Sequence, residues 1–345
     1  MRSIEMSFNS KYGYDWVFSY FDVESGGFPE ELRRRLEHMV TGNVIIEEIK
    51  RDNPYFNIPE SIDRHYLKWK GMSGSRYGLV PNHKYLDFKL KNRFHSYGFQ
   101  FLPTLSRYRY VCNVDIGTAL QCNVDDDFFR RMKTEEKAFG FSYAPVDSAV
   151  GVKTLFGTYL EFINQSEESG AVSSNNLQKF IINEGVTPLY TQCNMDSNMG
   201  IVDMDILRSE HYKRFFNHMD AAMGLFYERW TDYNLKTLYF STYVDKDKIL
   251  YIADSGYNDL LNRISCPINM EEKIAHKCVC DPRNDLAFSR SSCLRLFFNI
   301  TGMELPKDVE VTDIYGVKYK RARVKGKTYE NMFKRLEQKY RELFL

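Results

Sequence analysis

The sequence predicts an α/β protein with a central, mostly parallel mixed sheet and helices on both faces. Short runs rich in β-branched and aromatic residues alternate with segments of helical spacing, which is typical of strand–helix–strand units. The chain has 345 residues, of which 43% are hydrophobic, so it is long enough to build one large domain with an ample core.

The first elements are predicted from composition and from helix start signals. Residues 11–21 and 43–49 are rich in aromatic and β-branched side chains and are predicted to be strands. Residues 29–40, between them, begin with proline and are predicted to form a helix. Residues 108–117 form a further predicted strand, which ends in an acidic loop that contains Asp115.

The middle of the chain continues the alternation. Residues 125–144 predict a helix, then Gly140, then a strand. The triple acid Asp125, Asp126 and Asp127 stands at the predicted start of that helix, where negative charge is favourable, so capping is favoured over a metal site. Residues 164–176 are polar, contain Ser and Gly, and predict a surface loop.

A long amphipathic helix is predicted after Arg208, because apolar residues recur there at three- and four-residue steps. These residues are Tyr212, Phe215, Phe216, Met219, Met223, Phe226 and Trp230. Core packing is the favoured interpretation of this stripe. The charged residues just past its predicted end are better functional candidates, namely Glu228, Arg229 and Asp232.

The end of the chain differs from the rest. Six of the eleven residues 317–327 are Lys or Arg, which predicts a solvated linker, with contact to an anionic surface as the alternative. Residues 328–345 predict a terminal helix that packs on the body of the protein.

Composition excludes some classes of function. The formal net charge is +1, so the chain lacks the basic footprint of a nucleic-acid-binding protein. No apolar run approaches the roughly 18 residues of a transmembrane helix, and no secretory signal is visible. Aromatic residues make up 15% of the chain, which suits either a ring-rich core or carbohydrate stacking.

The seven cysteines leave several interpretations open. Four of them fall within residues 266–293, and Cys278 and Cys280 lie close to His276. Scattered buried thiols and a metal site are both consistent with this pattern, although one intervening residue is unusual spacing for a zinc site. The odd count leaves at least one thiol free or intermolecular.

Residues 193–259 carry a specific pattern. They contain CNMDSNMGIVDMDILRS, GLFYERWTD and YVDKDKILYIADSGYND. This series resembles the fungal α-1,2-mannosyltransferases of glycosyltransferase family 15, and the resemblance extends over residues 1 to about 298. It implies a GT-A-like catalytic-type domain over 1–298, followed by a basic extension over 299–345.

The resemblance also implies a function and a cellular setting. Family members are type II membrane proteins of the Golgi that transfer mannose from GDP-mannose to a glycan or glycoprotein acceptor, with retention of configuration and with Mn²⁺ or Mg²⁺. It implies no nucleic-acid partner. The family's first strand and membrane anchor precede the position of Met1. Three explanations stay open: the true start lies upstream, the chain has been trimmed, or part of the donor site is lacking.

The cysteine-rich segment, CPINMEEKIAHKCVCDPRNDLAFSRSSC, resembles the tail of the same family. The resemblance places the cysteines in a secretory-pathway protein and therefore implies disulfides. We expect this segment to cover the site as a disulfide-tied layer.

Two acids are expected to bind the metal. Asp115 matches the glutamate of the family's metal-binding motif, and Asp259 matches a metal-binding histidine. Carboxylates suit Mn²⁺ or Mg²⁺, so the resemblance implies that Asp115 and Asp259 face one cleft and share one ion with the donor diphosphate. The alternative is that both are loop acids that face water.

The expected donor site departs from the family pattern at one position. Phe88 stands where the family has a tyrosine, so a hydroxyl group is lost. Arg93, Phe94 and Ser96 match the family's Arg-Phe-x-Ser run. The resemblance therefore assigns donor binding to Phe88, Arg93, Asp115 and Asp232.

The expected catalytic site departs more sharply. Gly200 stands where the family has its proposed nucleophilic glutamate, and glycine has no group that can attack or accept a proton. Asp196 and Asp203 are candidate substitutes. Asp232 matches a functional aspartate of the family and is the expected essential acid; the alternative is that it merely pairs with Arg229.

Three hypotheses follow. The first is an active, metal-dependent mannosyltransferase. The second is a catalytically impaired or non-catalytic family member, because of Gly200. The third, a lectin-like glycan binder, rests only on aromatic content. A carboxylate of Asp196, Asp203 or Glu228 that reaches the space beside Gly200 would favour the first, and an apolar plug would favour the second.

Overall fold

The computed structural model describes residues 1–21, 26–50, 52–63, 86–183, 189–253, 255–259, 263–267, 270–281 and 284–304. The predicted basic linker at 317–327 and the predicted terminal helix at 328–345 lie outside these residues. No helix in the described ranges is long and apolar enough to cross a membrane.

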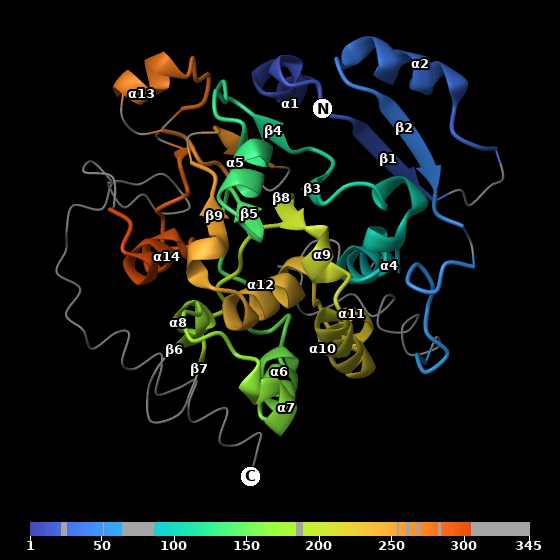
Figure 1. Cartoon of the computed structure of the whole chain (residues 1–345), viewed down its shortest axis with the longest axis vertical. Coiled ribbons are helices and arrows are strands. Elements are labelled where there is room, and N and C mark those ends of the chain that lie inside the picture. The colour runs from blue at the N-terminus through green and yellow to red at the C-terminus, as the bar shows by residue number, and fades with distance from the viewer. Residues whose placement is uncertain are drawn as a thin grey trace.

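The N-terminal segment builds a small parallel unit. Helix α1 (Arg2–Ser7) and the 3-10 turn η1 (Asn9–Lys11) precede β1 (Trp16–Tyr20), which pairs in parallel with β2 (Val44–Glu48) across α2 (Glu30–Met39) (Figure 1). The predicted helix and second strand are confirmed. The first strand starts later than predicted, because the 3-10 turn and Gly13, with φ of 66°, occupy its expected beginning.

The central sheet has the strand order β3-β8-β5-β9. Its strands are β3 (Tyr110–Val114), β8 (Met199–Asp203), β5 (Phe139–Phe141) and β9 (Ile249–Tyr251). The sheet is mixed, as predicted, but β8 runs antiparallel to both of its neighbours and only β5 and β9 pair in parallel. The predicted parallel majority is therefore wrong for this sheet. The alternation of strands and helices does not show whether a strand runs parallel or antiparallel to its neighbour. This is so for β8, because a long connection separates it from β5 in the sequence.

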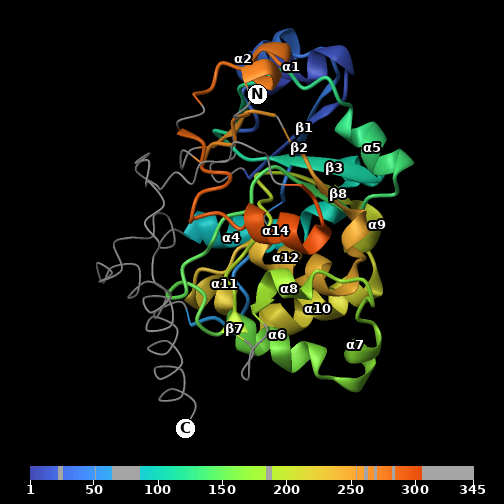
Figure 2. The same cartoon turned by 90° about the vertical axis from the view of Figure 1, so that its left-hand side faces the viewer.

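Helices cover both faces of this sheet, as predicted (Figure 2). Successive side chains of a strand point to opposite faces. On one face, Phe139, Phe141 and Val202 join a core formed with α4 (Leu86–Ser96), α6 (Leu155–Ile163), α10 (Glu210–Ala221), α12 (Asp232–Tyr243) and α14 (Leu294–Thr301). On the other face, Met199 and Ile201 pack with α1 and α5 (Phe128–Thr134).

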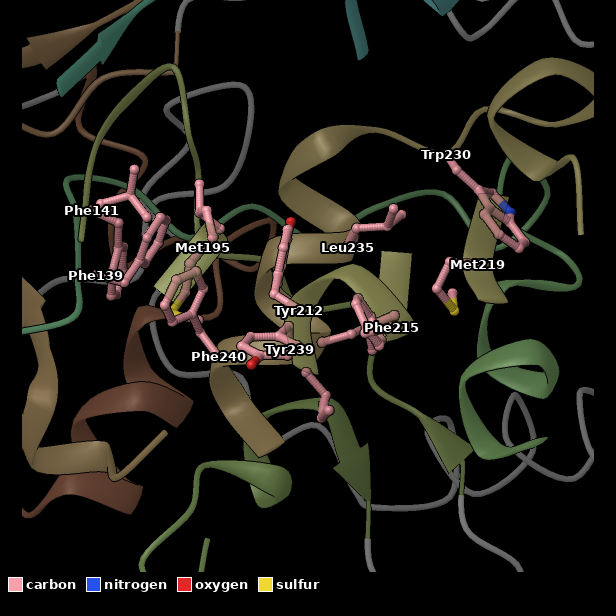
Figure 3. Close-up of a cluster of buried hydrophobic side chains, with 14 of the residues drawn as sticks. Phe139, Phe141, Met195, Tyr212, Phe215, Met219, Trp230, Leu235, Tyr239 and Phe240 are labelled. Atoms are coloured by element: carbon pink, nitrogen blue, oxygen red, sulfur yellow. The ribbon is translucent and has the colours of Figure 1, made fainter. Parts of the chain in front are cut away.

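The long helix predicted after Arg208 is broken. Helix α10 ends at Ala221, Met223 has a φ of 60°, and the short α11 (Gly224–Tyr227) follows. A β-carbon at Gly224 would lie 2.1 Å from the Trp230 ring, so the indole folds back onto this turn. The apolar stripe nevertheless enters one core, in which Tyr212, Phe215, Met219 and Trp230 lie together (Figure 3).

The sequence did not predict α12. Ten of the residues of this helix are buried, including polar ones. A helix that is buried on all sides presents no amphipathic stripe, so periodicity cannot reveal it. Its start is nevertheless well defined: the Thr231 hydroxyl accepts a hydrogen bond from the Asn234 amide, and the Asn234 side chain bonds back to Thr231.

The remaining elements are short. They are the helices α7 (Ser166–Gly170), α8 (Gln178–Ile181), α9 (Met204–Leu207) and α13 (Met270–Ala275), the 3-10 turns η2 (Phe99–Phe101), η3 (Pro103–Leu105) and η4 (Lys246–Lys248), and the strand pairs β4 (Ala119–Leu120) with β10 (Tyr257–Asn258) and β6 (Ile182–Asn183) with β7 (Leu189–Tyr190). The segment predicted as a loop at 164–176 therefore contains one turn of helix, α7.

Three disulfides involve the C-terminal part, and two of them tie it to the body, which confirms the expectation of disulfides. They join Cys122 to Cys278, Cys193 to Cys293, and Cys266 to Cys280. Cys112 is the free thiol among the described residues. The sulfurs of Cys122, Cys278 and Cys280 lie close enough to suggest a metal cluster, but all three belong to disulfides, so the metal interpretation of this segment is wrong.

Candidate functional site

A pocket of about 1890 Å³ opens between the N-terminal unit, α4, the end of β3 and the start of α12. Its lining includes Phe88, Asp115, Asp232 and Asp259, so the structure brings together four of the predicted site residues. This volume exceeds the roughly 300–1,000 Å³ of ordinary small-molecule sites. The pocket is therefore large enough for a nucleotide sugar together with an acceptor.

Arg93 lies outside this lining. Its Nε and Nη2 donate to the two carboxylate oxygens of Asp220 on α10, at 3.0 and 2.9 Å, and its Nη1 donates to the Pro54 carbonyl at 2.6 Å. These bonds hold α4 against α10. The structure therefore gives Arg93 a role in supporting the pocket wall, and none of these bonds presents it to a donor.

Asp115 follows the last residue of β3 and projects into the pocket. Its backbone N–H donates to the Asn198 carbonyl at 2.8 Å, which fixes the turn beside β8. Its carboxylate pairs with Lys91 of α4 and is 29% exposed. Sequence reasoning missed Lys91, because the pairing joins two segments that share no local pattern.

Asp259 has a different environment. Its carboxylate is almost fully buried and accepts from Arg263 Nε at 2.6 Å and from the Tyr257 hydroxyl at 3.2 Å. The same guanidinium reaches Asp196, whose Oδ2 lies 3.1 Å from Arg263 Nη2, and Asp196 also accepts from the Tyr257 hydroxyl at 2.7 Å. Arg263 therefore lies between Asp196 and Asp259.

The charges in this cluster support one another. Burial raises the pKa of the Asp196 carboxyl, and the Arg263 guanidinium acts in the opposite direction. Burial alone would lower the pKa of Arg263, but Asp196, Tyr257 and Asp259 outweigh burial and raise it. Sequence reasoning missed Arg263, although it stands only four residues after Asp259.

The described residues fit a divalent metal at Asp115 better than at Asp259. The amide of Asn198, in the orientation that satisfies both neighbours, donates to Asp115 Oδ2 at 3.3 Å and accepts from Arg263 Nη2 at 2.7 Å. Asn198 and Arg263 thus connect the two carboxylates. An ion shared by Asp115 and Asp259 would require Arg263 to leave Asp259.

Asp232 lies at the start of α12 and is held ionised. Its Oδ2 accepts from the Ser197 hydroxyl at 2.7 Å and from Lys236 Nζ at 2.8 Å. Burial alone would raise the pKa of Asp232, but the charges of Lys236 and His95, together with the bonds from Lys236 and Ser197, lower it to about 2. The alternative pairing with Arg229 is wrong, because Arg229 Nη1 binds Asp147 at 3.0 Å.

Gly200 lies inside the sheet, on β8, opposite Asn113 of β3. A β-carbon at this position would lie 3.0 Å from the Ser197 α-carbon and 3.4 Å from the Asp196 carbonyl oxygen. The space that a glutamate side chain would enter is thus partly filled by backbone atoms. It is filled neither by a carboxylate, which would favour activity, nor by an apolar side chain, which would favour a non-catalytic protein.

The three candidate substitutes for the missing glutamate have other partners. Asp196 binds Arg263 and Tyr257, and Asp203 binds Arg109 at 2.9 Å. Glu228 accepts from the Trp230 indole N–H at 2.8 Å and from the Thr154 amide. Each of the three carboxylates is therefore already engaged by a structural partner.

Acidification from pH 6.5 to pH 4 is expected to destabilise the native protein more than it destabilises a His95→Gln variant. Burial lowers the pKa of His95, which lines the pocket, from 6.5 to about 4. The native state therefore binds this proton less readily than the unfolded state. The contribution of neutral His95 is complete above pH 6.5 and is lost as the pH falls toward 4.

We expect the difference in unfolding free energy between the two proteins to change by on the order of 2 kcal/mol over this range. Urea unfolding at pH 7 and pH 4.5 measures it, and other groups that titrate in this window are common to both proteins. A difference that stays constant with pH would contradict the prediction.

Comparisons with known proteins identify the family of this chain. The family model described as glycolipid 2-alpha-mannosyltransferase matches residues 1–302. A glycolipid 2-alpha-mannosyltransferase 2 of Candida albicans is 29% identical over 90% of this chain, which spans 65% of that relative's length. A probable mannosyltransferase of Saccharomyces cerevisiae, KTR3, is 29% identical over 90% of this chain and 74% of its own length.

Among solved structures, core-mannan synthase A of Aspergillus fumigatus, determined in a Mn/GDP form, superposes with a TM-score of 0.74. The sequences are 27% identical, over 88% of this chain and 80% of that chain. This similarity confirms the expected GT-A-like α/β fold. Because the family model matches most of its length, the chain belongs to the glycolipid 2-alpha-mannosyltransferase family.

Proposed function

We propose that the protein transfers mannose from GDP-mannose to a glycan, forming an α-1,2 linkage with retention of configuration. The observation that carries the proposal is that Asp115 and Asp232 line one pocket in a chain of this family. One carboxylate ends a strand and the other begins a helix, so both are held on rigid elements. The relatives are named as mannosyltransferases, and one was solved with manganese and GDP.

Asp115 would hold Mn²⁺ or Mg²⁺, together with diphosphate oxygens of the donor, since these ions commonly bind one or two carboxylates plus substrate phosphates. The ion would neutralise the charge of the departing diphosphate. Lys91, which pairs with Asp115, adds a positive charge at the same wall of the pocket. Phe88 lines the pocket as an apolar surface in place of the family's tyrosine.

Asp232 contributes a fixed negative charge. With a pKa of about 2 it is ionised at neutral pH and is a poor proton acceptor. Its role is therefore to stabilise the positive charge that develops on the sugar in the transition state, or to orient the acceptor hydroxyl. The acceptor proton would then pass to the leaving diphosphate.

A second candidate function is a family member that binds GDP-mannose without transferring the sugar. The observation that favours it is the backbone of Ser197 beside Gly200, which leaves the position of the family's proposed nucleophile without a side chain and with little room for one. The two candidates share a donor site and differ only in chemistry.

We also propose that the protein acts in the Golgi lumen on glycan or glycoprotein acceptors, without a nucleic-acid partner. Three disulfides support this, because disulfides persist in oxidising compartments such as the secretory pathway. We assign residues 1–298 to the catalytic-type domain and residues 299–345 to a basic extension.

The test combines transfer and binding. The purified 345-residue protein, with Mn²⁺ and radiolabelled GDP-mannose, is expected to label methyl α-mannoside, and an α-1,2-specific mannosidase should release the label. Calorimetry with GDP measures donor binding separately. Binding without transfer would support the second candidate, whereas the absence of GDP binding in the presence of Mn²⁺ would refute both.

A further inference from the structure

Arg263 is a charged residue that lines this pocket and that neither the resemblance nor the proposed mechanism uses. It lines the pocket and its side chain is 14% exposed. Its hydrogen-bond partners lie on one side of the guanidinium. Nε and Nη2 are engaged by Asp259, Asp196 and Asn198. None of the described residues accepts a hydrogen bond from Nη1.

We propose that Arg263 binds the diphosphate of the nucleotide donor, and that Asp259 serves as the anchor of Arg263 and not as a metal ligand. The inference rests on the proposed function, which supplies the diphosphate. A guanidinium presents several N–H donors in a rigid plane and binds phosphate oxygens well. Because Asp196 and Asp259 already hold this guanidinium, little side-chain entropy is lost when a ligand binds Nη1.

The position of Arg263 relative to Asp115 supports this role. The Asn198 amide separates Arg263 Nη2 from Asp115 Oδ2, with contacts of 2.7 and 3.3 Å on its two sides. A diphosphate that meets an ion at Asp115 therefore lies beside Arg263 as well. Both phosphate groups would then face positive charge, one from the ion and one from the guanidinium.

The charge balance shows that Arg263 acts beside a metal and does not substitute for it. The cluster holds the carboxylates of Asp115, Asp196 and Asp259 against the cations of Lys91 and Arg263. When all five groups are charged, one negative charge is left over. A divalent ion at Asp115 reverses this sign, so that both Arg263 and the ion attract a diphosphate.

The same balance explains the carboxylate at position 259. A histidine ligand, as the resemblance implies for the family, would leave Arg263 with Asp196 alone. Asp259 instead accepts from Nε of the guanidinium and orients its plane. Asp259 and Arg263 therefore act as a pair. Where the resemblance implies a histidine that binds the metal, this chain instead has a fixed cation beside the metal site.

The test measures affinity for GDP and for guanosine, in the presence of Mn²⁺, by calorimetry. Arg263→Lys keeps the charge and loses the planar fork. Arg263→Gln combined with Asp259→Asn removes one charge of each sign, so that only Asp196 keeps a buried charge and Tyr257 still donates to it. We expect both variants to bind GDP about 10- to 100-fold more weakly, as for a lost hydrogen bond between charged groups, with guanosine binding unchanged.

Two controls separate the proposed roles. Arg214→Gln removes an arginine that also pairs with a buried acid, Glu168, but lies outside the pocket lining, so GDP affinity should not change. Electron paramagnetic resonance of Mn²⁺ in the presence of GDP reports on the metal. Asp259→Asn should retain Mn²⁺ and Asp115→Asn should lose it.

GDP affinity that is equal in wild-type protein and in both Arg263 variants would overturn the inference while the proposed function stands. Loss of Mn²⁺ in Asp259→Asn would also overturn it, because Asp259 would then be a metal ligand. Wild-type protein that binds no GDP with Mn²⁺ would refute the proposed function and the inference together. Near-ultraviolet circular dichroism confirms that each variant is folded.

Discussion

Mannosyl transfer is expected to fall on the order of 100-fold or more when Asp232 is replaced by Asn. The substitution keeps the shape of the side chain and removes its negative charge. Asp232 is held by Ser197 and Lys236 at the wall of the pocket, so a transition state with positive charge on the sugar meets a fixed anion there. GDP-mannose turnover, with and without the substitution, measures the effect.

Asp232→Asn should also lower stability, and this effect must be separated from catalysis. Lys236 is only 2% exposed and would remain as a buried charge without its partner, a situation that commonly costs about 3–5 kcal/mol. The double variant Asp232→Asn, Lys236→Met removes both charges. We expect it to recover much of the stability, measured by urea unfolding, and to remain as inactive as the single variant.

A double variant that regains transfer would show that Asp232 acts only through its pairing with Lys236. Unchanged turnover in Asp232→Asn would end the assignment of Asp232 as the essential acid. If the wild-type protein transfers no mannose, the stability cycle still tests the buried pair, because its outcome does not depend on activity.

The elements that could be predicted are those with a local signal. The helix that became α2 begins with a proline and carries one apolar stripe, and the strand that became β2 is a β-branched run. Helix α12 carries no such signal, since almost every side chain in it is buried. The break between α10 and α11 depends on a contact between Gly224 and Trp230 that the spacing of apolar residues cannot show.

The residues of the site also divide into those that the sequence indicates and those that only the fold brings together. The acids Asp115, Asp232 and Asp259, which line one pocket, could be proposed because a resemblance assigns roles to positions along the chain. Their cationic partners Lys91, Lys236 and Arg263 could not, because a partner is chosen by the fold. The expected metal pair shows the consequence: two carboxylates were expected to share one ion, and the structure places an arginine on one of them.

Replacement of Gly200 by Glu is expected to destabilise the protein by several kcal/mol and to produce no gain of transfer. Gly200 lies in β8 between two neighbouring strands, and even a β-carbon would lie 3.0 Å from the Ser197 α-carbon. A longer side chain must displace Ser197, whose hydroxyl holds Asp232. The new carboxylate would also be buried inside the sheet, and burial of an uncompensated charge is expensive.

A series of substitutions separates these causes. Gly200→Ala adds only the β-carbon and should cost about 1–3 kcal/mol through overpacking. Gly200→Gln matches the size of glutamate, so the difference between Gln and Glu reports the charge. Gly157→Ala is the control, because a β-carbon at that helical glycine has no neighbour within 4 Å and should stabilise the protein by up to about 1 kcal/mol. Thermal unfolding and GDP-mannose turnover are measured for all four.

The outcome decides between the two candidate functions. Suppose that the wild type is inactive and that Gly200→Glu transfers mannose at a similar melting temperature. The segment around Ser197 then moves at little cost in stability, and the chain lacks activity only because it lacks a glutamate at position 200. If the wild type is active and Gly200→Glu is not, the reaction in this chain proceeds without a carboxylate at position 200. Asp232 then stabilises the sugar cation alone. Ser197, whose α-carbon lies against Gly200, holds Asp232 in position through its hydroxyl group.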